Sequence, residues 1–173
     1  DIDGGSTDNC GIASLNATIS SFDCGDLGAN TVSLFVIDTN GNAAGCTATV
    51  TVEDNIAPVV TGSITASDVE GCDASAAPAA ETTVAGLEGL TGDLAIADAC
   101  TADTNLVVTS SDASDGNTCP EVITRTYTVT DACSNASVDI VHTITIDDTT
   151  APVVSGSITA SDVEGCDASA APA

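Results

Sequence analysis

A near-identical internal repeat constrains the fold of this chain more than any other feature. Residues 57–79 read APVVTGSITASDVEGCDASAAPA, and residues 151–173 repeat them with a single change, from Thr61 to Ser155. The two copies begin 94 residues apart, at 57 and at 151, which is about the length of one β-sandwich domain. The spacing therefore predicts a complete module over 57–150 and the N-terminal part of the next, near-identical module over 151–173.

Residues 1–56 are predicted to be the C-terminal part of a related but diverged module. FDCGDLGANTVSLFVIDTNGN (22–42) aligns with TCPEVITRTYTVTDACSN (118–135), and TATVTVEDNIAPVV (47–60) aligns with HTITIDDTTAPVV (142–154). The alignment gives three equivalent pairs: Cys24 and Cys119, Cys10 and Cys100, and Asp38 and Asp131. We therefore expect the chain to begin and end within modules, as part of a much longer protein.

Alternating β-branched residues indicate half-buried strands. The predicted strands are Thr31–Ile37, Cys46–Val52, Val122–Val129 and Val138–Ile146. The pattern places Cys46 on the inner face of the second strand, and Ile140, His142, Ile144 and Ile146 on the inner face of the fourth. Together with the repeat length, these strands predict an all-β chain of tandem immunoglobulin-like antiparallel β-sandwich modules of roughly seven strands each, stapled by disulfides.

The charge of the chain excludes one class of partner. It has 1 Lys or Arg, 26 Asp plus Glu and a formal net charge of −25, so nucleic acid is excluded, because phosphate binding needs basic side chains. The same imbalance opposes docking on anionic lipid, and no apolar run is long enough for membrane insertion. Cations are the natural partners of such a surface. With 43% hydrophobic residues, the chain can still bury a core.

Eight cysteines indicate an oxidising, extracellular or cell-surface location, where disulfides persist. The four cysteines of 57–150 allow three connectivities. We favour Cys100–Cys119, because the diverged module keeps the equivalent pair Cys10–Cys24, and this leaves Cys72–Cys133. Cys46 and Cys166 are expected to pair outside the chain.

Several short patterns resemble those of known surface repeats. D-N-C-G at Asp8–Gly11, F-D-C at Phe22–Cys24, the turn at Val36–Asn42 and the segment Cys46–Pro58 resemble the hyalin-type (HYR-like) repeats of bacterial surface proteins. The E-G-C, D-A-C, T-C-P and T-R-T-Y-T-V-T-D-A-C-S-N patterns of 57–150 resemble repeats in giant adhesins of Bacteroidota, the group that includes flavobacterial gliding adhesins. The resemblance implies an immunoglobulin-like fold, export to the cell surface and a role as filament or stalk.

The acidic linker Glu53–Pro58 is similar to the calcium-binding linkers of cadherins. Calcium takes six to eight oxygen ligands and tolerates irregular geometry. In an immunoglobulin-like module, two further acidic loops would face this linker, which predicts a calcium site built from Glu53, Asp54, Asn55, Asp98, Asp131 and Asn135. The alternative is that these are solvated linker and turn residues. Asp38-x-Asn40-x-Asn42 lacks the later Glu of an EF-hand and is interpreted as an ordinary turn.

Three other residues have simple interpretations. His142 is expected to be a strand residue at a sheet margin, and Arg125 is expected to form a surface ion pair. Thr149, within Asp-Thr-Thr, resembles an O-glycosylation signal of Bacteroidota. No pattern typical of catalysis is present, so the chain is not expected to be an enzyme.

These features favour a structural role. The expected function is a spacer or stalk repeat of a long secreted adhesin or filament, serving surface attachment and, by the resemblance, gliding motility. Its partners would be neighbouring repeats of the same chain, like filaments, or an external surface or polysaccharide. The alternative is a glycan- or polymer-binding module, but one Tyr, two Phe and no Trp leave little to stack on sugars.

Overall fold

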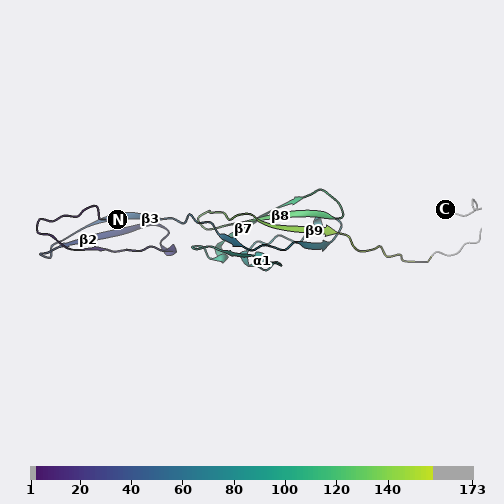
Figure 1. The fold of residues 1–173 in the computed structure, drawn as a ribbon, viewed down its shortest axis with the longest axis horizontal. Coiled ribbons are helices and arrows are strands. Elements are labelled where there is room, and N and C mark those ends of the chain that lie inside the picture. Colours follow the sequence, from purple (N-terminus) through teal and green to yellow (C-terminus); the bar gives the residue numbers. More distant parts are fainter. Residues whose placement is uncertain (1–2, 158–173) are drawn as a thin grey trace, which may run out of the picture.

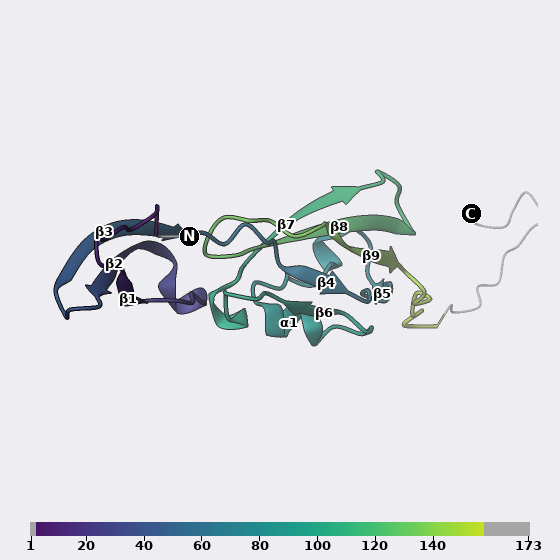
Figure 2. The same cartoon turned by 60° about the vertical axis from the view of Figure 1, so that its left-hand side comes forward.

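The computed structural model describes residues 3–157 of the chain. It is an elongated, mostly β structure with few helical turns (Figure 1). A three-stranded sheet lies at one end, and two further sheets follow it along the long axis (Figures 1 and 2). We call residues 3–56 the N-terminal segment and residues 57–150 the central segment.

The N-terminal segment forms an antiparallel sheet of order β1-β2-β3. Its strands are β1 (Ile12–Ala17), β2 (Gly28–Asp38) and β3 (Ala43–Val52), and the 3-10 turn η1 (Cys24–Asp26) precedes β2. Asp38 closes the β2–β3 turn, because its carboxylate accepts hydrogen bonds from the backbone N–H groups of Asn40 and Asn42, both at 2.8 Å. The Asn-Gly turn predicted here is confirmed.

The central segment contains a two-stranded and a four-stranded sheet. The first pairs β4 (Val59–Thr61) with β6 (Ala95–Ala97), and the second has the order β5-β9-β8-β7. In the second sheet only β5 and β9 pair in parallel. Its strands and the remaining short elements are β5 (Ser67–Glu70), β7 (Val107–Ser114), β8 (Glu121–Thr130), β9 (Ile140–Asp147), α1 (Val84–Glu88), η2 (Ala74–Ala76) and η3 (Asp103–Asn105).

The main hydrophobic core lies in the central segment, and both of its sheets contribute to it. Ile96 of β6, Leu87 of α1 and Val129 of β8 belong to one buried cluster. Tyr127 is 1% exposed in the same cluster, and its hydroxyl accepts a hydrogen bond from the Glu81 N–H at 3.2 Å. Burial of these groups supplies the main driving force for folding.

The four predicted strands correspond to β2, β3, β8 and β9. The inner face predicted for β9 is confirmed, because Ile140, His142, Ile144 and Ile146 are all buried. The inward position predicted for Cys46 is wrong, because Cys46 is exposed. It lies on β3, an edge strand of the N-terminal sheet whose residues Ala43–Thr49 are all exposed in the described structure.

Arg125 and His142 are both more buried than the sequence predicts. Arg125 forms the expected ion pair, with two hydrogen bonds of 2.7 and 2.8 Å to the Asp112 carboxylate, but it is only 4% exposed and also donates to the Pro78 carbonyl. His142 lies on β9, between β5 and β8, and not at a sheet margin. The two side chains are neighbours in the β8–β9 register.

The Cys24–Cys100 disulfide joins the two segments, and residues 3–157 form a single domain of mostly antiparallel sheets. The module boundaries 1–56, 57–150 and 151–173 stay a prediction. Most of 151–173, including Cys166, lies outside the described residues.

Candidate metal centre at the junction of the two segments

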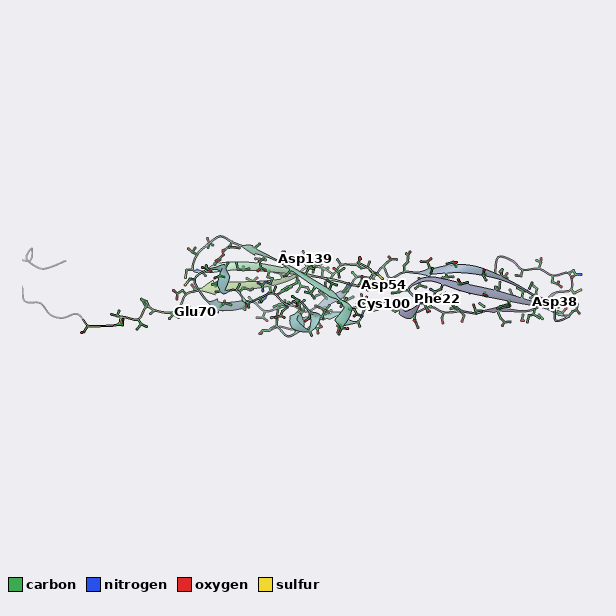
Figure 3. The ribbon with its side chains drawn as sticks, turned by 180° about the vertical axis from the view of Figure 1, so that it is seen from behind. Phe22, Asp38, Asp54, Glu70, Cys100 and Asp139 are labelled. Carbon is green, nitrogen blue, oxygen red and sulfur yellow. A yellow bond between two sulfur atoms is a disulfide. The ribbon has the colours of Figure 1, made fainter. Side chains whose placement is uncertain are left out.

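Three aspartates meet where the two segments join. Asp54 follows the end of β3, Asp98 directly follows β6, and Asp131 directly follows β8. These strand ends come together in the middle of the elongated molecule, where Asp54 lies beside Cys100 (Figure 3). We call Asp54, Asp98, Asp131 and the adjacent Asn135 the junction site.

The spacing of the three carboxylates suits a single cation. One oxygen from each carboxylate lies within 4.8 Å of the other two. Oxygens bound to one Ca²⁺ at about 2.4 Å are at most about 5 Å apart, so the three oxygens fall within the limit set by a shared ion. Asp54 of the linker is 8% exposed and Asp131 of the turn after β8 is 4% exposed, so both residues are buried rather than solvated.

Hydrogen bonds hold each carboxylate in place. Asp98 Oδ1 accepts the backbone N–H groups of Cys100 and Thr101 at 3.0 and 2.6 Å. The Asn135 side-chain amide donates to Asp131 Oδ2 at 2.7 Å and to the Asp54 backbone carbonyl at 2.9 Å. Asn135 therefore ties the linker to the turn after β8, across the two segments.

Two carboxylate oxygens of this site have no hydrogen-bond partner in the part of the chain that the structure describes. Asp54 Oδ2 and Asp98 Oδ2 are buried and accept no hydrogen bond; among the described residues, the one other buried side-chain atom of this kind is His142 Nδ1. A buried acceptor without a partner is costly, and a buried carboxylate more so. The only basic side chain besides His142 is Arg125, and it is bonded to Asp112. A bound cation would satisfy both oxygens.

Asp131 is held in its charged form. Burial raises the pKa of Asp131, but hydrogen bonds from Asn135, Cys133 and Ser134 outweigh it, and the pKa lies below its ordinary value. Asp131 is therefore a carboxylate at neutral pH, as a calcium ligand must be.

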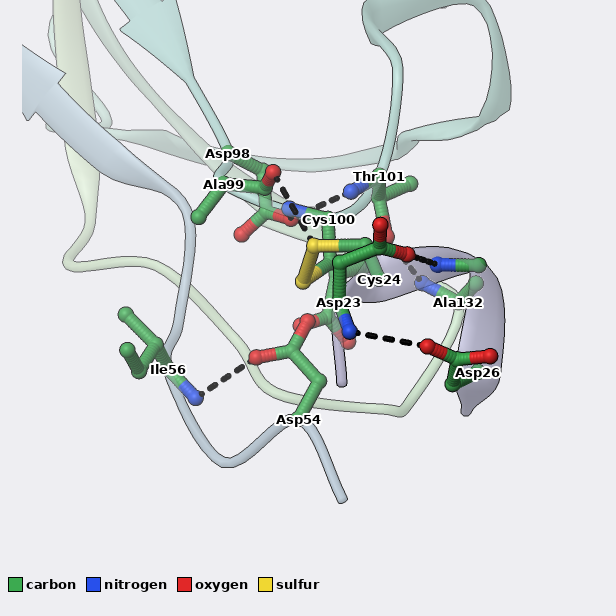
Figure 4. The surroundings of a disulfide bond; sticks show 12 residues. Asp23, Cys24, Asp26, Asp54, Ile56, Asp98, Ala99, Cys100, Thr101 and Ala132 are labelled. Atoms are coloured by element: carbon green, nitrogen blue, oxygen red, sulfur yellow. Dashed lines mark hydrogen bonds between the residues drawn. A yellow bond between two sulfur atoms is a disulfide. The ribbon is translucent and has the colours of Figure 1, made fainter. Parts of the chain in front are cut away.

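The junction also carries a disulfide, between Cys24 and Cys100. It joins η1 of the N-terminal segment to the loop after β6, and Asp54 and Asp98 lie beside it (Figure 4). Asp23 caps η1, because its carboxylate accepts the Gly25 N–H at 2.8 Å, and this fixes the turn that presents Cys24.

This bond corrects the pairings Cys10–Cys24 and Cys100–Cys119. In each predicted pair a full strand separates the two cysteines, which places them at opposite ends of a sheet. A strand of eight residues spans about 25 Å, whereas the Cα atoms of a disulfide lie within about 7 Å. Recurrence of an equivalent cysteine pair in both modules therefore does not mean that the two cysteines of each pair are bonded to each other.

The predicted pair Cys72–Cys133 does not form, and within residues 3–157 both thiols are free and exposed. Cys72 follows β5, which ends beside the C-terminal end of β9, because the Gly71 N–H donates to the Asp147 carbonyl at 3.2 Å. Cys133 lies in the turn at the other end of the sheet. Cys46 is free within the described residues, and its pairing outside the chain stays a prediction, as does that of Cys166.

The remaining predicted site residues lie apart from the carboxylate cluster. Glu53 and Asn55 are exposed linker residues, and the Asn55 amide is 3.5 Å from the Glu53 carboxylate. Thr149 lies at the far end of the central segment, where its hydroxyl donates to Glu70 at 2.5 Å. Glycosylation of Thr149 stays a prediction.

Comparison of the sequence with protein-family models and with curated proteins gives no match. None of the helices in residues 3–157 is long and apolar enough to cross a membrane. The junction bond was missed from the sequence. Cys24 and Cys100 lie on either side of the acidic linker, but so do Cys46 and Cys72, and the order of the cysteines alone does not single out the bonded pair.

Proposed function

We propose that this chain is a structural spacer of a long extracellular surface protein, in which a calcium ion and a disulfide stiffen the junction between successive immunoglobulin-like β-sandwich modules. The observation that carries the proposal is the junction site, where buried carboxylates from both segments converge without a counter-charge. A spacer needs stiff, repeatable junctions and no unique pocket.

Calcium is the cation that fits the donors best. All the donors are oxygens, three of them carboxylates on irregular loops, whereas zinc favours His and Cys ligands and magnesium demands near-ideal octahedral geometry. The Cys24–Cys100 bond supports an oxidising, extracellular location. The facing sheets of the central segment support the sandwich architecture.

Calorimetric titration of the full chain with calcium chloride tests the metal site. We expect one site with a Kd of about 0.1–1 mM, as in extracellular modules. At 100 times the Kd, calcium should stabilise the fold by about 2.7 kcal/mol, which raises the Tm by about 5–10 °C relative to EDTA.

Matched variants locate the effect. Asp98→Asn and Asp54→Asn should each abolish most of the heat and the Tm shift, because each replaces a carboxylate of the junction site. Asp139→Asn removes the same charge from an exposed position of the central segment and should change neither. Equal losses of binding heat and Tm shift in all three variants, or no calcium binding by the native chain, would contradict the calcium proposal.

A glycan array separates the spacer from a binding module. The spacer predicts no hits, whereas reproducible hits on one class of polysaccharide would favour the alternative. Electron microscopy of the parent particle should show beads at a regular spacing along a fibre, and a compact globule would contradict the spacer.

A further inference from the structure

The far end of the central segment repeats one half of the junction. Asp148 corresponds to Asp54: its Oδ1 accepts the Thr150 N–H at 3.0 Å, as Asp54 Oδ1 accepts the Ile56 N–H at 3.1 Å. Cys119, the equivalent of Cys24, lies beside it, with its sulfur 3.3 Å from the Asp148 N–H. Figure 3 shows Glu70, which holds the same linker through Thr149, at this end of the molecule.

The opposite tip of the N-terminal segment repeats the other half. Asp38 and Asn42 share the hydrogen-bond pattern of Asp131 and Asn135: the Asn amide donates to the Asp Oδ2 at 2.7 Å in both turns. The Cys10 N–H donates to Asp8 Oδ1 at 2.7 Å, as the Cys100 N–H donates to Asp98 Oδ1 at 3.0 Å.

The structure therefore contains two kinds of repeat end. One end carries a thiol and a linker carboxylate (Cys24 with Asp54, and Cys119 with Asp148). The other carries a thiol and two turn carboxylates (Cys100 with Asp98 and Asp131, and Cys10 with Asp8 and Asp38). Where one end of each kind meets, the two thiols are bonded, as Cys24–Cys100. Cys119 and Cys10 are free and exposed in the described structure.

We infer that Cys119 forms an inter-repeat disulfide, and that its partner is the Cys100-type cysteine of the next repeat in the same chain. The occupant follows from the sequence, because residues 151–173 restart the repeat immediately after the Asp148 linker. The inference rests on the proposed function for the role of the bond, which would be to stiffen each junction between repeats. Formation of the bond itself does not depend on calcium binding.

The chemistry of the bond balances with an external disulfide as oxidant. The Cys119 thiolate attacks oxidised glutathione and releases one glutathione. The partner thiolate then attacks the mixed disulfide, forming the inter-repeat bond and releasing the second glutathione. Two thiols thus lose two protons and two electrons, and one disulfide is reduced to two thiols.

The test uses the full chain continued after Ala173 by a copy of residues 80–150, which completes a second repeat. The added copy carries Ala102→Gly as a mass tag next to its Cys100-type cysteine. After oxidation in a glutathione buffer, unreduced peptides are mapped by mass spectrometry. We expect the Cys119 peptide to be linked to the tagged peptide, and the Cys24 peptide to be linked to the untagged one.

Variants and a second arm make the outcome decisive. Cys119→Ser should abolish the tagged link and keep Cys24–Cys100, whereas Cys72→Ser, at the same end, should keep both. The original chain, without the added copy, should remain a monomer with a free Cys119. A dimer linked by Cys119–Cys10 would instead show that the partner of Cys119 belongs to a second chain. A Cys119–Cys72 bond, a link to the untagged peptide or a free Cys119 in the extended chain would overturn the inference.

Failure of this inference differs from failure of the proposed function. The disulfide map is measured in EDTA as well as in calcium. If the Cys119 link forms but calcium does not bind, the proposed metal site is contradicted and the inter-repeat bond is not. If calcium binds but the link does not form, the inter-repeat bond is contradicted and the metal site is not.

Discussion

At the scale of single residues, His142 has the most unusual environment. Its Nε2 lies 3.0 Å from the Ser67 hydroxyl, and its Nδ1 is buried with no hydrogen-bond partner among residues 3–157. Burial lowers the pKa of His142, and the positive charge of Arg125 lowers it further. The ring is therefore neutral in the folded chain.

The lowered pKa of His142 predicts a pH dependence of stability. The unfolded chain takes up a proton on His142 near the ordinary pKa of 6.5, whereas the folded chain takes it up only at a lower pH. The contribution is therefore complete above about pH 6.5 and is lost as the pH falls below it. Urea unfolding in EDTA should give a smaller free energy of unfolding at pH 5 than at pH 7.

His142→Asn is the control for this prediction, because its side chain does not titrate. The variant should lose most of the change between pH 7 and pH 5. The aspartates with lowered pKa values, such as Asp112, affect stability only below about pH 4. An unchanged slope in the variant would assign the pH dependence to another group.

At the scale of single elements, α1 shows how a short helix contributes to the core. Thr83 caps it, because its hydroxyl accepts the Gly86 N–H at 3.0 Å. Five residues are too few to form a stable helix alone, so the burial of Val84 and Leu87 against the β6 and β8 side chains stabilises it.

Leu87→Ala should therefore destabilise the central segment strongly. Leu87 is 0% exposed, and truncating such a leucine costs about 3–5 kcal/mol. We expect a Tm about 10 °C lower by differential scanning calorimetry. Ala85→Ser, on the exposed side of the same helix, should change stability by only about 0.5 kcal/mol. Similar losses in both variants would mean that helix propensity, and not packing, dominates.

At the scale of the whole molecule, the junction decides how the two segments are held. The Cys24–Cys100 bond closes a loop with a sequence separation of 76 residues. Asn135 and the carboxylates of the junction site add polar contacts across the same boundary. The disulfide, these hydrogen bonds and, by our proposal, a calcium ion thus all hold the two segments together at one place in the elongated molecule (Figure 2).

Replacing both junction cysteines should loosen this connection. In the chain-entropy model, a loop of this length contributes about 4 kcal/mol, so Cys24→Ser with Cys100→Ser should lower the Tm clearly. Small-angle scattering should show a broader distribution of shapes, because the linker becomes a hinge. Cys46→Ser, which removes a free exposed thiol, should change neither. A rigid double variant would show that the noncovalent contacts suffice.

Four of the strands of this protein could be predicted from residue alternation alone. Alternation of β-branched residues located β2, β3, β8 and β9, because side chains of a strand face opposite sides with a period of two. The likeness of the linker to cadherin linkers, combined with the loop placement of an immunoglobulin-like module, predicted that Asp54, Asp98 and Asp131 lie together, and the structure groups their carboxylates.

The pairing of the cysteines, in contrast, follows from the placement of the sheets and could not be predicted from the sequence. Two cysteines can pair only if they lie at the same end of a sheet. A strand between two cysteines that are close in sequence places them at opposite ends, far apart in space. The burial of Arg125 and His142 was likewise undecided by the sequence, because alternation assigns a face but not the elements that cover it. Local periodicity is encoded in neighbouring residues, whereas contacts across the junction depend on how whole sheets are placed.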